Sequence, residues 1–344
     1  MKKILGFLGS VVLVSLLCSC GKPKQTLHIY NWGDYMSDSV IKQFEKEFNC
    51  KVKVDVFDSN EAMYAKLMVG AGGYDILVPS SYMAKLMYEQ KMIKKLDMAK
   101  LPNVTANFDR SYENLMLDKT MEYSIPYFVS FTGIGYEPEK VKDFKPSWRM
   151  FEQADLKKRC SLLNDQREVL GCALLTLGYD ANSVEPAQLD EAVNLAKIWK
   201  QNIAKFEVDD AKRALASGEF FLIQTYSGDM FQVIQEKPTI KFIIPEEGST
   251  VTFDTFAITA NSQNSDLAHE FINFMYRAEV AAENMDEIGY ITPNVAAAKL
   301  VSDEMKSNPV FNIPAEERAR CTPLEDLGEK KDLYNQAWDK ILEE

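Results

Sequence analysis

The chain has 344 residues, 46% of them hydrophobic and 26% charged, which is the composition of a globular protein rather than of a disordered chain. Asp and Glu together number 51 against 39 Lys and Arg, and the formal net charge at pH 7 is -12. This acidic balance argues against nucleic acid and anionic membrane surfaces as partners, and it is compatible with a cationic ligand. Single hydrophobic cores stop growing at roughly 250–300 residues, so the length predicts two domains.

The first 20 residues have the pattern of an export signal. A short basic head precedes an apolar run over residues 4–17, which is shorter than the roughly 20 residues that a membrane-spanning helix needs. The run ends in LCSC, the pattern of a bacterial lipobox with Cys20 as the lipidated residue. We therefore expect a lipoprotein signal peptide over 1–19, a lipidated tether over 20–25, and an extracytoplasmic protein anchored to a membrane. An ordinary cleaved signal with a chance cysteine is the alternative.

Strand and helix patterns alternate from the start of the mature chain. Residues 27–30 are predicted as a strand, and Ser37 can cap the helix that follows. Residues 51–56 alternate between charged residues and valine, which is typical of a strand with one buried face. A second helix ends at the glycines in 70–73 and leads to a buried strand over 74–78. Such alternation predicts a mostly parallel sheet covered by helices on both faces.

The same alternation of elements returns in the second half of the chain. A short strand there runs into a helix, and a later strand again precedes a helix, as in the first half. The expected elements are a strand at 161–163, a helix from about 166, a helix along 189–199, a strand at 220–225, a helix from about 227 and a helix along 267–275.

No Gly/Ser-rich linker separates the two halves, so we expect the chain to cross between the domains more than once. Two stretches fit such a crossing: residues 130–136, extended and glycine-containing, and residues 251–258, an alternating strand. In open α/β sheets ligands bind where strands end, and a cleft between two lobes is a common pocket. The sequence therefore predicts two α/β lobes with a ligand cleft between them.

Four cysteines follow the predicted signal: Cys50, Cys160, Cys172 and Cys321. Their spacing shows no metal-binding pattern and no C-x-x-C motif. We expect most of them to be small buried hydrophobic residues. A Cys160–Cys172 disulfide stays open, since export would permit it.

Motifs of common enzyme classes are missing from the sequence. There is no G-x-S-x-G, no P-loop, no H-E-x-x-H and no dinucleotide fingerprint. The two histidines, His28 and His269, lie far apart in the sequence and are expected to be structural. Acid–base chemistry by carboxylates alone stays open but has no support. We expect no catalytic residue, no cofactor and no metal site.

Five loops that follow strands or helices combine aromatic, acidic and hydroxyl side chains. Carboxylates satisfy protonated amines through charge-assisted hydrogen bonds, and aromatic faces attract cations and pack along alkyl chains. Together such loops favour a receptor for an alkyl diamine, although any single Asp after a strand is also a common helix cap. The loops are NWGDY at 31–35, PSSY at 79–82, NDQRE at 164–168, YSGD at 226–229 and GYITPN at 289–294.

At these loops, and over nearly all of the chain after residue 26, the sequence resembles the spermidine/putrescine-binding proteins of bacterial ABC importers. The stretches that carry the resemblance are IYNWGDY at 29–35, NEAMYAKL at 60–67, YSIPY at 123–127, REV at 167–169, FDT at 253–255 and IGYITPN at 288–294. The resemblance implies a two-lobed, type II-like periplasmic binding protein fold of class α/β, each lobe a mostly parallel sheet flanked by helices. The N-terminal lobe would comprise 26–131 and about 254–298, and the C-terminal lobe 132–253 and about 299–344.

The resemblance also implies a role for each loop. Aromatic residues would form walls along the ligand, carboxylates would hold its nitrogens, and Ser81 or Ser80 would add a hydroxyl or carbonyl contact. The walls would be Trp32, Tyr35, Tyr82, Tyr226 and Tyr290; Asp34 would lie beside the ligand, Asp165 and Glu168 would meet a terminal amine, and Asp254 would hold an inner or distal nitrogen.

Several positions depart from the family pattern. Tyr226 stands where the family usually has tryptophan, Thr252 replaces a large aromatic residue, and Leu324 replaces a polar one. Conversely, Asp229 and the glycine before Asp34 are similar to the branch that prefers putrescine. We therefore expect a site that accepts putrescine and spermidine, with a preference for putrescine.

The resemblance implies a monomeric protein that captures a small polyamine and delivers it to an ABC permease in the cytoplasmic membrane. A receptor for another solute is the first alternative; Arg167 would suit a carboxylate ligand, but bracing of Asp165 or Glu168 is the simpler interpretation. An extracytoplasmic enzyme and a surface adhesin are the other two.

Overall fold

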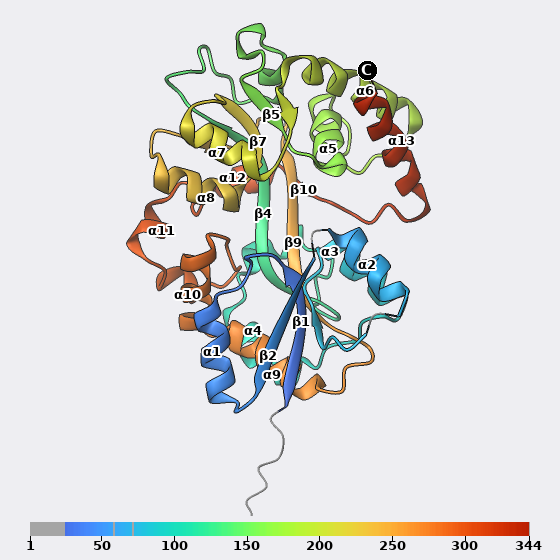
Figure 1. The fold of residues 1–344 in the computed structure, drawn as a ribbon, viewed down its shortest axis with the longest axis vertical. Helices are drawn as coiled ribbons and strands as arrows, with labels where there is room; N and C mark the ends of the chain where they lie inside the picture. Colours follow the sequence, from blue (N-terminus) through green and yellow to red (C-terminus); the bar gives the residue numbers. More distant parts are fainter. Residues whose placement is uncertain (1–24, 58, 71, 344) are drawn as a thin grey trace, which may run out of the picture.

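The computed structural model describes residues 25–57, 59–70 and 72–343. Two α/β lobes lie end to end, and two long strands, β4 (Ile125–Tyr136) and β9 (Ser249–Ile258), run between them (Figure 1). The two-lobed α/β fold is therefore confirmed. The stretches expected to cross between the lobes lie in these two strands, so the lobe limits expected at residues 131 and 253 fall inside them.

The strands of the described chain form one mixed sheet in the order β2-β1-β3-β9-β4-β7-β5-β6, with β10 beside β9 and β8 beside β4. In each lobe three strands pair in parallel, β2-β1-β3 in the N-terminal lobe and β7-β5-β6 in the C-terminal lobe. The crossing strands β9 and β4 add antiparallel pairs. The other strands are β1 (Thr26–Trp32), β2 (Lys51–Phe57), β3 (Ile76–Leu77), β5 (Cys160–Leu162), β6 (Lys205–Phe206), β7 (Leu222–Tyr226), β8 (Lys241–Ile243) and β10 (Cys321–Pro323).

Helices flank the sheet in both lobes (Figure 1). The N-terminal lobe carries α1 (Asp38–Glu47), α2 (Asn60–Met68), α3 (Ser81–Glu89), α4 (Pro102–Asn107), α9 (Ser265–Met275) and α10 (Ala278–Ile288). The C-terminal lobe carries α5 (Gln166–Thr176), α6 (Pro186–Asn202), α7 (Asp209–Ser217), α8 (Ser227–Glu236), α12 (Ala315–Arg318) and α13 (Lys331–Leu342), while α11 (Asp303–Ser307) lies between α8 and α10. Short 3₁₀ turns occupy Met98–Lys100, Arg110–Leu115, Trp148–Glu152, Ala154–Leu156, Ala297–Lys299 and Gly328–Lys330.

The start of the chain illustrates how local sequence sets these elements. The Ser37 hydroxyl accepts hydrogen bonds from the backbone N–H groups of Ser39 and Val40, so it caps α1 as predicted. The alternating residues 51–56 form β2, but this strand lies at the edge of the sheet, and Val56 is 57% exposed. The strand prediction is confirmed, whereas its expected buried face is only partly covered.

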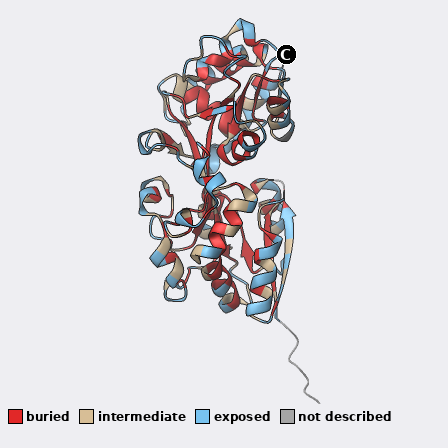
Figure 2. Cartoon of the chain, turned by 90° about the vertical axis from the view of Figure 1, so that its left-hand side faces the viewer, coloured by how far each residue is buried: buried red, intermediate tan, exposed pale blue. Residues whose placement is uncertain are grey.

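Buried side chains fill the interior of both lobes (Figure 2). The largest apolar cluster runs from β1 and α1 through the crossing strands into α7 and α8, so it joins the two lobes. A second cluster belongs to the C-terminal lobe and includes Trp148, Trp199 and Tyr334. A third, smaller cluster lies beneath α2 and α3. Because one core continues across the crossing strands, the two lobes share part of their stabilisation.

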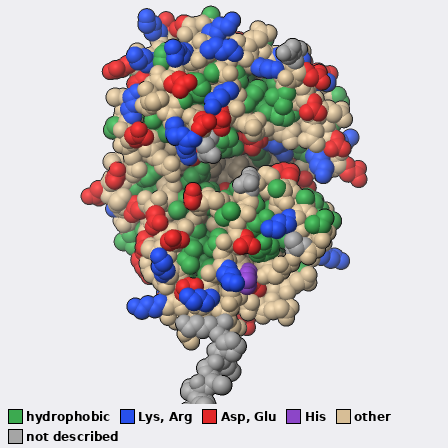
Figure 3. Space-filling model, in the orientation of Figure 1, with side chains coloured by type: hydrophobic (Ala, Val, Ile, Leu, Met, Phe, Trp, Pro, Cys, Tyr) green, Lys and Arg blue, Asp and Glu red, His purple; other side chains and the backbone are tan. Residues whose placement is uncertain are grey.

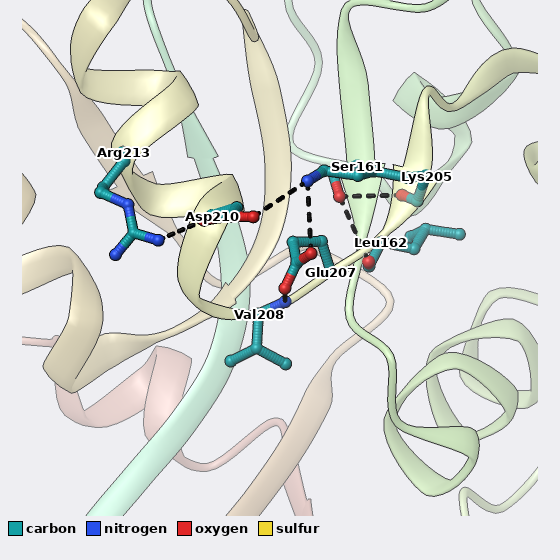
Figure 4. A network of polar contacts seen from close by, with 7 residues as sticks. All are labelled: Ser161, Leu162, Lys205, Glu207, Val208, Asp210 and Arg213. Atoms are coloured by element: carbon teal, nitrogen blue, oxygen red, sulfur yellow. Dashed lines mark hydrogen bonds and ion pairs between the residues drawn. The ribbon is translucent and has the colours of Figure 1, made fainter.

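The short edge strand β6 is held by a polar network (Figure 4). The Lys205 ammonium bonds to Glu207 at 3.2 Å and Asp210 at 3.4 Å, Arg213 pairs with Asp210, and the Ser161 hydroxyl donates to the Lys205 carbonyl at 2.9 Å. Exposed charges at a sheet edge discourage pairing with another chain. We therefore assign this network to the edge of the sheet and not to ligand binding.

All four cysteines of the described chain are buried and free, so the disulfide that was left open for Cys160 and Cys172 is not formed. The predicted signal peptide over 1–19, Cys20 and most of the expected tether lie outside the described residues. Within the described chain, no helix has the length and apolar character needed to cross a membrane.

Candidate functional site

The space-filling view is hollowed between the two lobes (Figure 3). Asp254 lies in the middle of β9, opposite Phe128 of β4. Its carboxylate accepts a hydrogen bond from the Tyr35 hydroxyl at 2.8 Å on one oxygen and from the Ser80 hydroxyl at 2.8 Å on the other. Burial raises the pKa of the Asp254 carboxyl to about 6, while these two hydrogen bonds lower it. Each oxygen still has a lone pair for a further donor, such as an ammonium group.

Asn60, at the start of α2, organises the residues around Ser80. Its side-chain oxygen accepts the backbone N–H of Ser80 at 3.1 Å, while its amide nitrogen donates to the Ser80 hydroxyl at 3.1 Å and to the Tyr82 hydroxyl at 2.9 Å. Ser80 rather than Ser81 is thus bonded to Asp254; Ser81 is the buried first residue of α3. Sequence reasoning did not identify Asn60, because the first turn of a predicted helix gives no sign of such contacts.

Aromatic rings surround Tyr35. The Tyr290 ring lies edge-on to Tyr35 at 5.1 Å between ring centroids, and Phe128 does so at 5.0 Å. The Tyr127 hydroxyl donates to the Tyr35 carbonyl at 2.6 Å and fixes the loop after β1. Phe128 was not predicted as part of the site; its place opposite Asp254 across the two strands is the feature that brings it there.

Two further residues of the loop after β1 have structural contacts of their own. The Trp32 indole N–H donates to the Val78 carbonyl at 2.9 Å, and its ring lies 4.4 Å from that of Phe57. Asp34 is exposed and adopts a left-handed backbone with φ 48°. It lines a hollow of about 340 Å³ whose other residues are Met36, Asp38, Gln232, Glu287 and Ile288, none of which was predicted as a site residue.

The second group of carboxylates lies at the start of α5. One Asp165 oxygen caps the helix by accepting the backbone N–H groups of Arg167 at 2.8 Å and Glu168 at 3.2 Å. Its other oxygen lies 3.4 Å from the Tyr226 hydroxyl. The helix-cap interpretation of this residue is therefore confirmed, and its use by a ligand stays a prediction.

Glu168 is buried, and the Thr250 hydroxyl of β9 donates to its carboxylate. Burial and the neighbouring Asp165 charge raise the pKa of Glu168 to about 7, and the hydroxyls of Thr250 and Thr132 lower it. The Arg167 guanidinium instead donates to the Glu325 carbonyl at 2.9 Å and to the Asn182 side chain at 2.8 Å. The Arg167 guanidinium therefore braces Glu168 only through its charge, which lowers the pKa of that carboxyl.

The start of α8 holds Tyr226 and Asp229. Asp229 forms an ion pair with Lys212 of α7 at 3.0 Å, so part of its charge is satisfied within the C-terminal lobe. Gly228, which lies between Tyr226 and Asp229 in the sequence, packs directly against Tyr290. A Cβ added at Gly228 would come within 2.2 Å of the tyrosine ring. The structure therefore brings Tyr290, from the loop after α10, into contact with the first turn of α8.

The arrangement has the features of a binding site. Two acidic centres, one at Asp254 and one at Asp165 and Glu168, are accompanied by aromatic rings and hydroxyl groups. The described residues contain no cluster of three or more His, Cys, Asp or Glu that is suited to a metal ion. The backbone N–H of His28 donates to the Asp75 carboxylate, and the His269 ring accepts from the backbone N–H of Asp97.

Comparisons with known proteins agree with this picture. The sequence profile of the bacterial extracellular solute-binding proteins matches residues 39–313. The spermidine/putrescine-binding periplasmic protein of Escherichia coli K12 is 35% identical over 318 residues, covering 92% of this chain and 91% of that protein.

Two solved structures are similar throughout. A spermidine/putrescine ABC transporter substrate-binding protein from Streptococcus pneumoniae superposes with a TM-score of 0.81 at 33% identity, covering 92% of this chain and 100% of that one. A lipoprotein of Treponema pallidum gives a TM-score of 0.84 at 34% identity, covering 92% and 99%. These matches cover more than nine tenths of the chain. The chain therefore belongs to the family of bacterial extracellular solute-binding proteins.

Proposed function

We propose that the protein is the substrate-binding component of a polyamine ABC importer and binds putrescine, spermidine or both in the cleft between its lobes. The observation that carries the proposal is the Asp254 carboxylate, which two hydroxyls hold beside the rings of Tyr35, Tyr290 and Phe128. A carboxylate binds an ammonium group, and the rings pack along an alkyl chain. The polyamine-binding proteins to which the chain is similar support the same ligand class.

In the proposed site, Asp254 binds one nitrogen, and Asp165 with Glu168 binds another at the far end. The walls are Trp32, Tyr35, Tyr82, Tyr226 and Tyr290, as expected from the sequence. We further propose the lobe limits given above, so that Asp254 and Tyr290 belong to one lobe and Asp165, Glu168 and Tyr226 to the other. Because the ligand would contact both lobes at once, it would favour their closed arrangement.

The family places the protein outside the cytoplasm. We propose in addition that it is anchored by a lipid on Cys20, that it acts as a monomer, and that the closed form delivers its ligand to a membrane permease without covalent chemistry. The lipobox pattern supports the anchor. Labelling with a palmitate analogue tests it: a Cys20→Ser variant is expected to lose the label.

Calorimetric titration of ligand-stripped protein that starts at Gly21 tests the function. Putrescine, spermidine, cadaverine and arginine are titrated separately. We expect saturable 1:1 binding of putrescine or spermidine and no heat from arginine, whose carboxylate would meet the acidic residues. Silence from every amine would contradict the proposal and direct the search to another solute of the same family. Turnover of an amine in the same samples would instead favour an enzyme.

A further inference from the structure

One face of the crossing strands connects the two acidic centres. Side chains alternate along a strand, so Thr250, Thr252 and Asp254 of β9 share a face. Asp254 lies opposite Phe128 and Thr252 opposite Ser130, and directly paired residues of antiparallel strands point to the same side. At the far end of the row, Thr250 donates to Glu168. The row therefore runs from Asp254, past Ser130 and Thr252, to Glu168.

The middle of this row is polar and incompletely satisfied. Ser130 is 9% exposed, and its hydroxyl oxygen is buried without a hydrogen-bond partner among the described residues. A buried polar group that lacks a partner costs free energy, so such a group in a native protein calls for an explanation. Thr252, its partner across the strands, carries a second hydroxyl on the same face of the sheet. The two hydroxyls, here called the hydroxyl pair, place two hydrogen-bond acceptors on adjacent strands.

We propose that the hydroxyl pair of Ser130 and Thr252 binds the inner nitrogen of a linear triamine and so selects triamines of the spermidine class over diamines. This inference rests on the proposed function and deepens it. A secondary ammonium carries two N–H donors, and two hydroxyl oxygens on adjacent strands match them in number. The ligand nitrogen supplies the partner that the Ser130 hydroxyl otherwise lacks.

The spacing of the row fits three nitrogens. A strand rises about 3.4 Å per residue, so the Cα atoms of Asp254 and Thr250 are separated by about 14 Å, with Thr252 midway between them. A triamine that lies along this face places one terminal nitrogen at Asp254, the other near Glu168 and the inner one over the hydroxyl pair. A short diamine leaves either one acidic centre or the hydroxyl pair without a partner.

The two sequence features that favour putrescine have other contacts in the structure. Asp229 forms an ion pair with Lys212, and Asp34 lines the hollow that also contains Gln232 and Glu287. Neither contact involves the row of residues on β4 and β9. The hydroxyl pair is therefore the feature of the site that distinguishes ligands by an inner nitrogen.

The test compares spermidine with 1,8-diaminooctane, which keeps the length and both terminal amines but has CH₂ in place of the inner nitrogen. Affinities are measured by calorimetry for the wild type and for the Ser130→Ala/Thr252→Val double variant. We expect the wild type to bind spermidine about tenfold more tightly than 1,8-diaminooctane, a ratio that two hydrogen bonds to a charged group can supply. In the double variant the ratio is expected to fall to about twofold or less, because both acceptors are gone.

Ser249→Ala is the matched control, since it removes a hydroxyl from the opposite face of β9, where that hydroxyl donates to the Thr132 carbonyl at 2.6 Å. It is expected to keep the wild-type ratio. Thermal unfolding supplies a second readout: Ser130→Ala removes no hydrogen bond that the described structure contains, so its melting temperature should equal or exceed that of the wild type. An unchanged ratio in the double variant, or equal wild-type affinities for the two ligands, would overturn the inference while leaving the proposed function standing. Failure of the wild type to bind any amine would overturn both.

Discussion

The two acidic centres, one at Asp254 and one at Asp165 and Glu168, are built in different ways. Asp254 is held by hydroxyls from residues 219 and 174 positions away in the sequence. Asp165 is held by backbone N–H groups only 2 and 3 positions along its own helix. The cap that Asp165 forms therefore depends only on α5, although Glu168 beside it also needs Thr250 of β9, whereas the Asp254 centre needs distant parts of the N-terminal lobe to be folded together. A ligand that bridges the two centres would contact Asp165, whose position is set by its own helix, and Asp254, whose position is set by tertiary packing.

The carboxyl groups of the two centres also differ in the pH at which they ionise. Burial raises the pKa of Asp254 to about 6 and, together with the Asp165 charge, that of Glu168 to about 7. A carboxyl group whose pKa is raised on folding stabilises the folded protein below its unfolded pKa, and this contribution is lost as the pH rises through the folded value. Bound ammonium groups have the opposite preference, because they favour the ionised carboxylates. As the pH rises through about 6 to 7, the unliganded protein should therefore lose stability, whereas ligand binding should become stronger.

The largest expected effect is that of Asp254→Asn. It removes the charge but keeps the shape and one acceptor oxygen, so polyamine affinity should fall at least tenfold, on the order of the 1.5–3 kcal/mol assigned to a charge-assisted hydrogen bond. Calorimetry measures the loss, and circular dichroism checks that the fold is intact. Asp190→Asn, which removes an exposed carboxylate paired with Lys340, is the control and should bind normally. Normal binding by Asp254→Asn would place the ligand elsewhere.

Glu168→Gln should show a smaller effect with a marked pH dependence. Near pH 6 the wild-type carboxyl is largely protonated, so the variant should bind almost as well as the wild type. At pH 8 the wild-type group is ionised, and the variant should bind about tenfold more weakly, as expected for loss of one charged contact. Titrations from pH 5 to 8 separate the two centres: the variant should retain the rise in affinity near pH 6 that Asp254 causes and lose the rise near pH 7. Parallel curves for the two proteins would contradict the assigned roles.

Gly228→Ala tests whether the two centres depend on the same closed arrangement. The added Cβ would lie 2.2 Å from the Tyr290 ring, so α8 and the loop after α10 must separate slightly. We expect affinity to fall about fivefold, equivalent to roughly 1 kcal/mol, and small-angle scattering of the liganded variant to show a more extended molecule. Gly72→Ala is the matched control, because its Cβ would meet only the Gly70 carbonyl at 4.0 Å. An unchanged affinity would show that Tyr290 can shift without cost.

The comparison of the two centres also explains what the sequence could predict. Periodicity and capping residues predicted α1 and α5, because helices depend on neighbours within a few positions, and alternation predicted β9, although its pairing with β4 joins distant positions. The resemblance to polyamine-binding proteins brought Tyr35, Tyr290 and Asp254 into one group, and the structure places them in contact through Tyr35. Their use by a ligand stays a prediction.

Contacts between residues far apart in the chain could not be predicted from the sequence. Nothing local distinguishes Ser80 from Ser81, yet only the first is bonded to Asp254, because it precedes α3 at the point where the chain meets β9. The pairing of Asp229 with Lys212 likewise depends on how α7 packs on α8. The exposure of Val56 follows from the edge position of β2, which the alternating pattern cannot reveal.

Asn60→Asp is expected to have the smallest effect, and it tests how the Asp254 centre is organised. Aspartate keeps the oxygen that accepts the Ser80 backbone N–H but loses both donors, to the Ser80 and Tyr82 hydroxyls. The Ser80 hydroxyl can then turn toward residue 60 and away from Asp254, and a second negative charge lies nearby. Both changes raise the pKa of Asp254 above about 6. Affinity at pH 8 should fall only about threefold. The midpoint of the rise in affinity near pH 6, which Asp254 causes, should move toward neutral pH.

The phenols of Tyr35 and Tyr127 interact with the Asp254 charge, but burial raises their own pKa values, so neither ionises in this range. Ser59→Ala supplies the control, since it removes the side-chain cap of α2 but leaves Asn60 in place. It should lower the melting temperature without moving the pH midpoint. If Asn60→Asp lowers stability in the same way and leaves the midpoint unchanged, Asn60 only supports α2, and Asp254 is organised by Tyr35 and Ser80 alone.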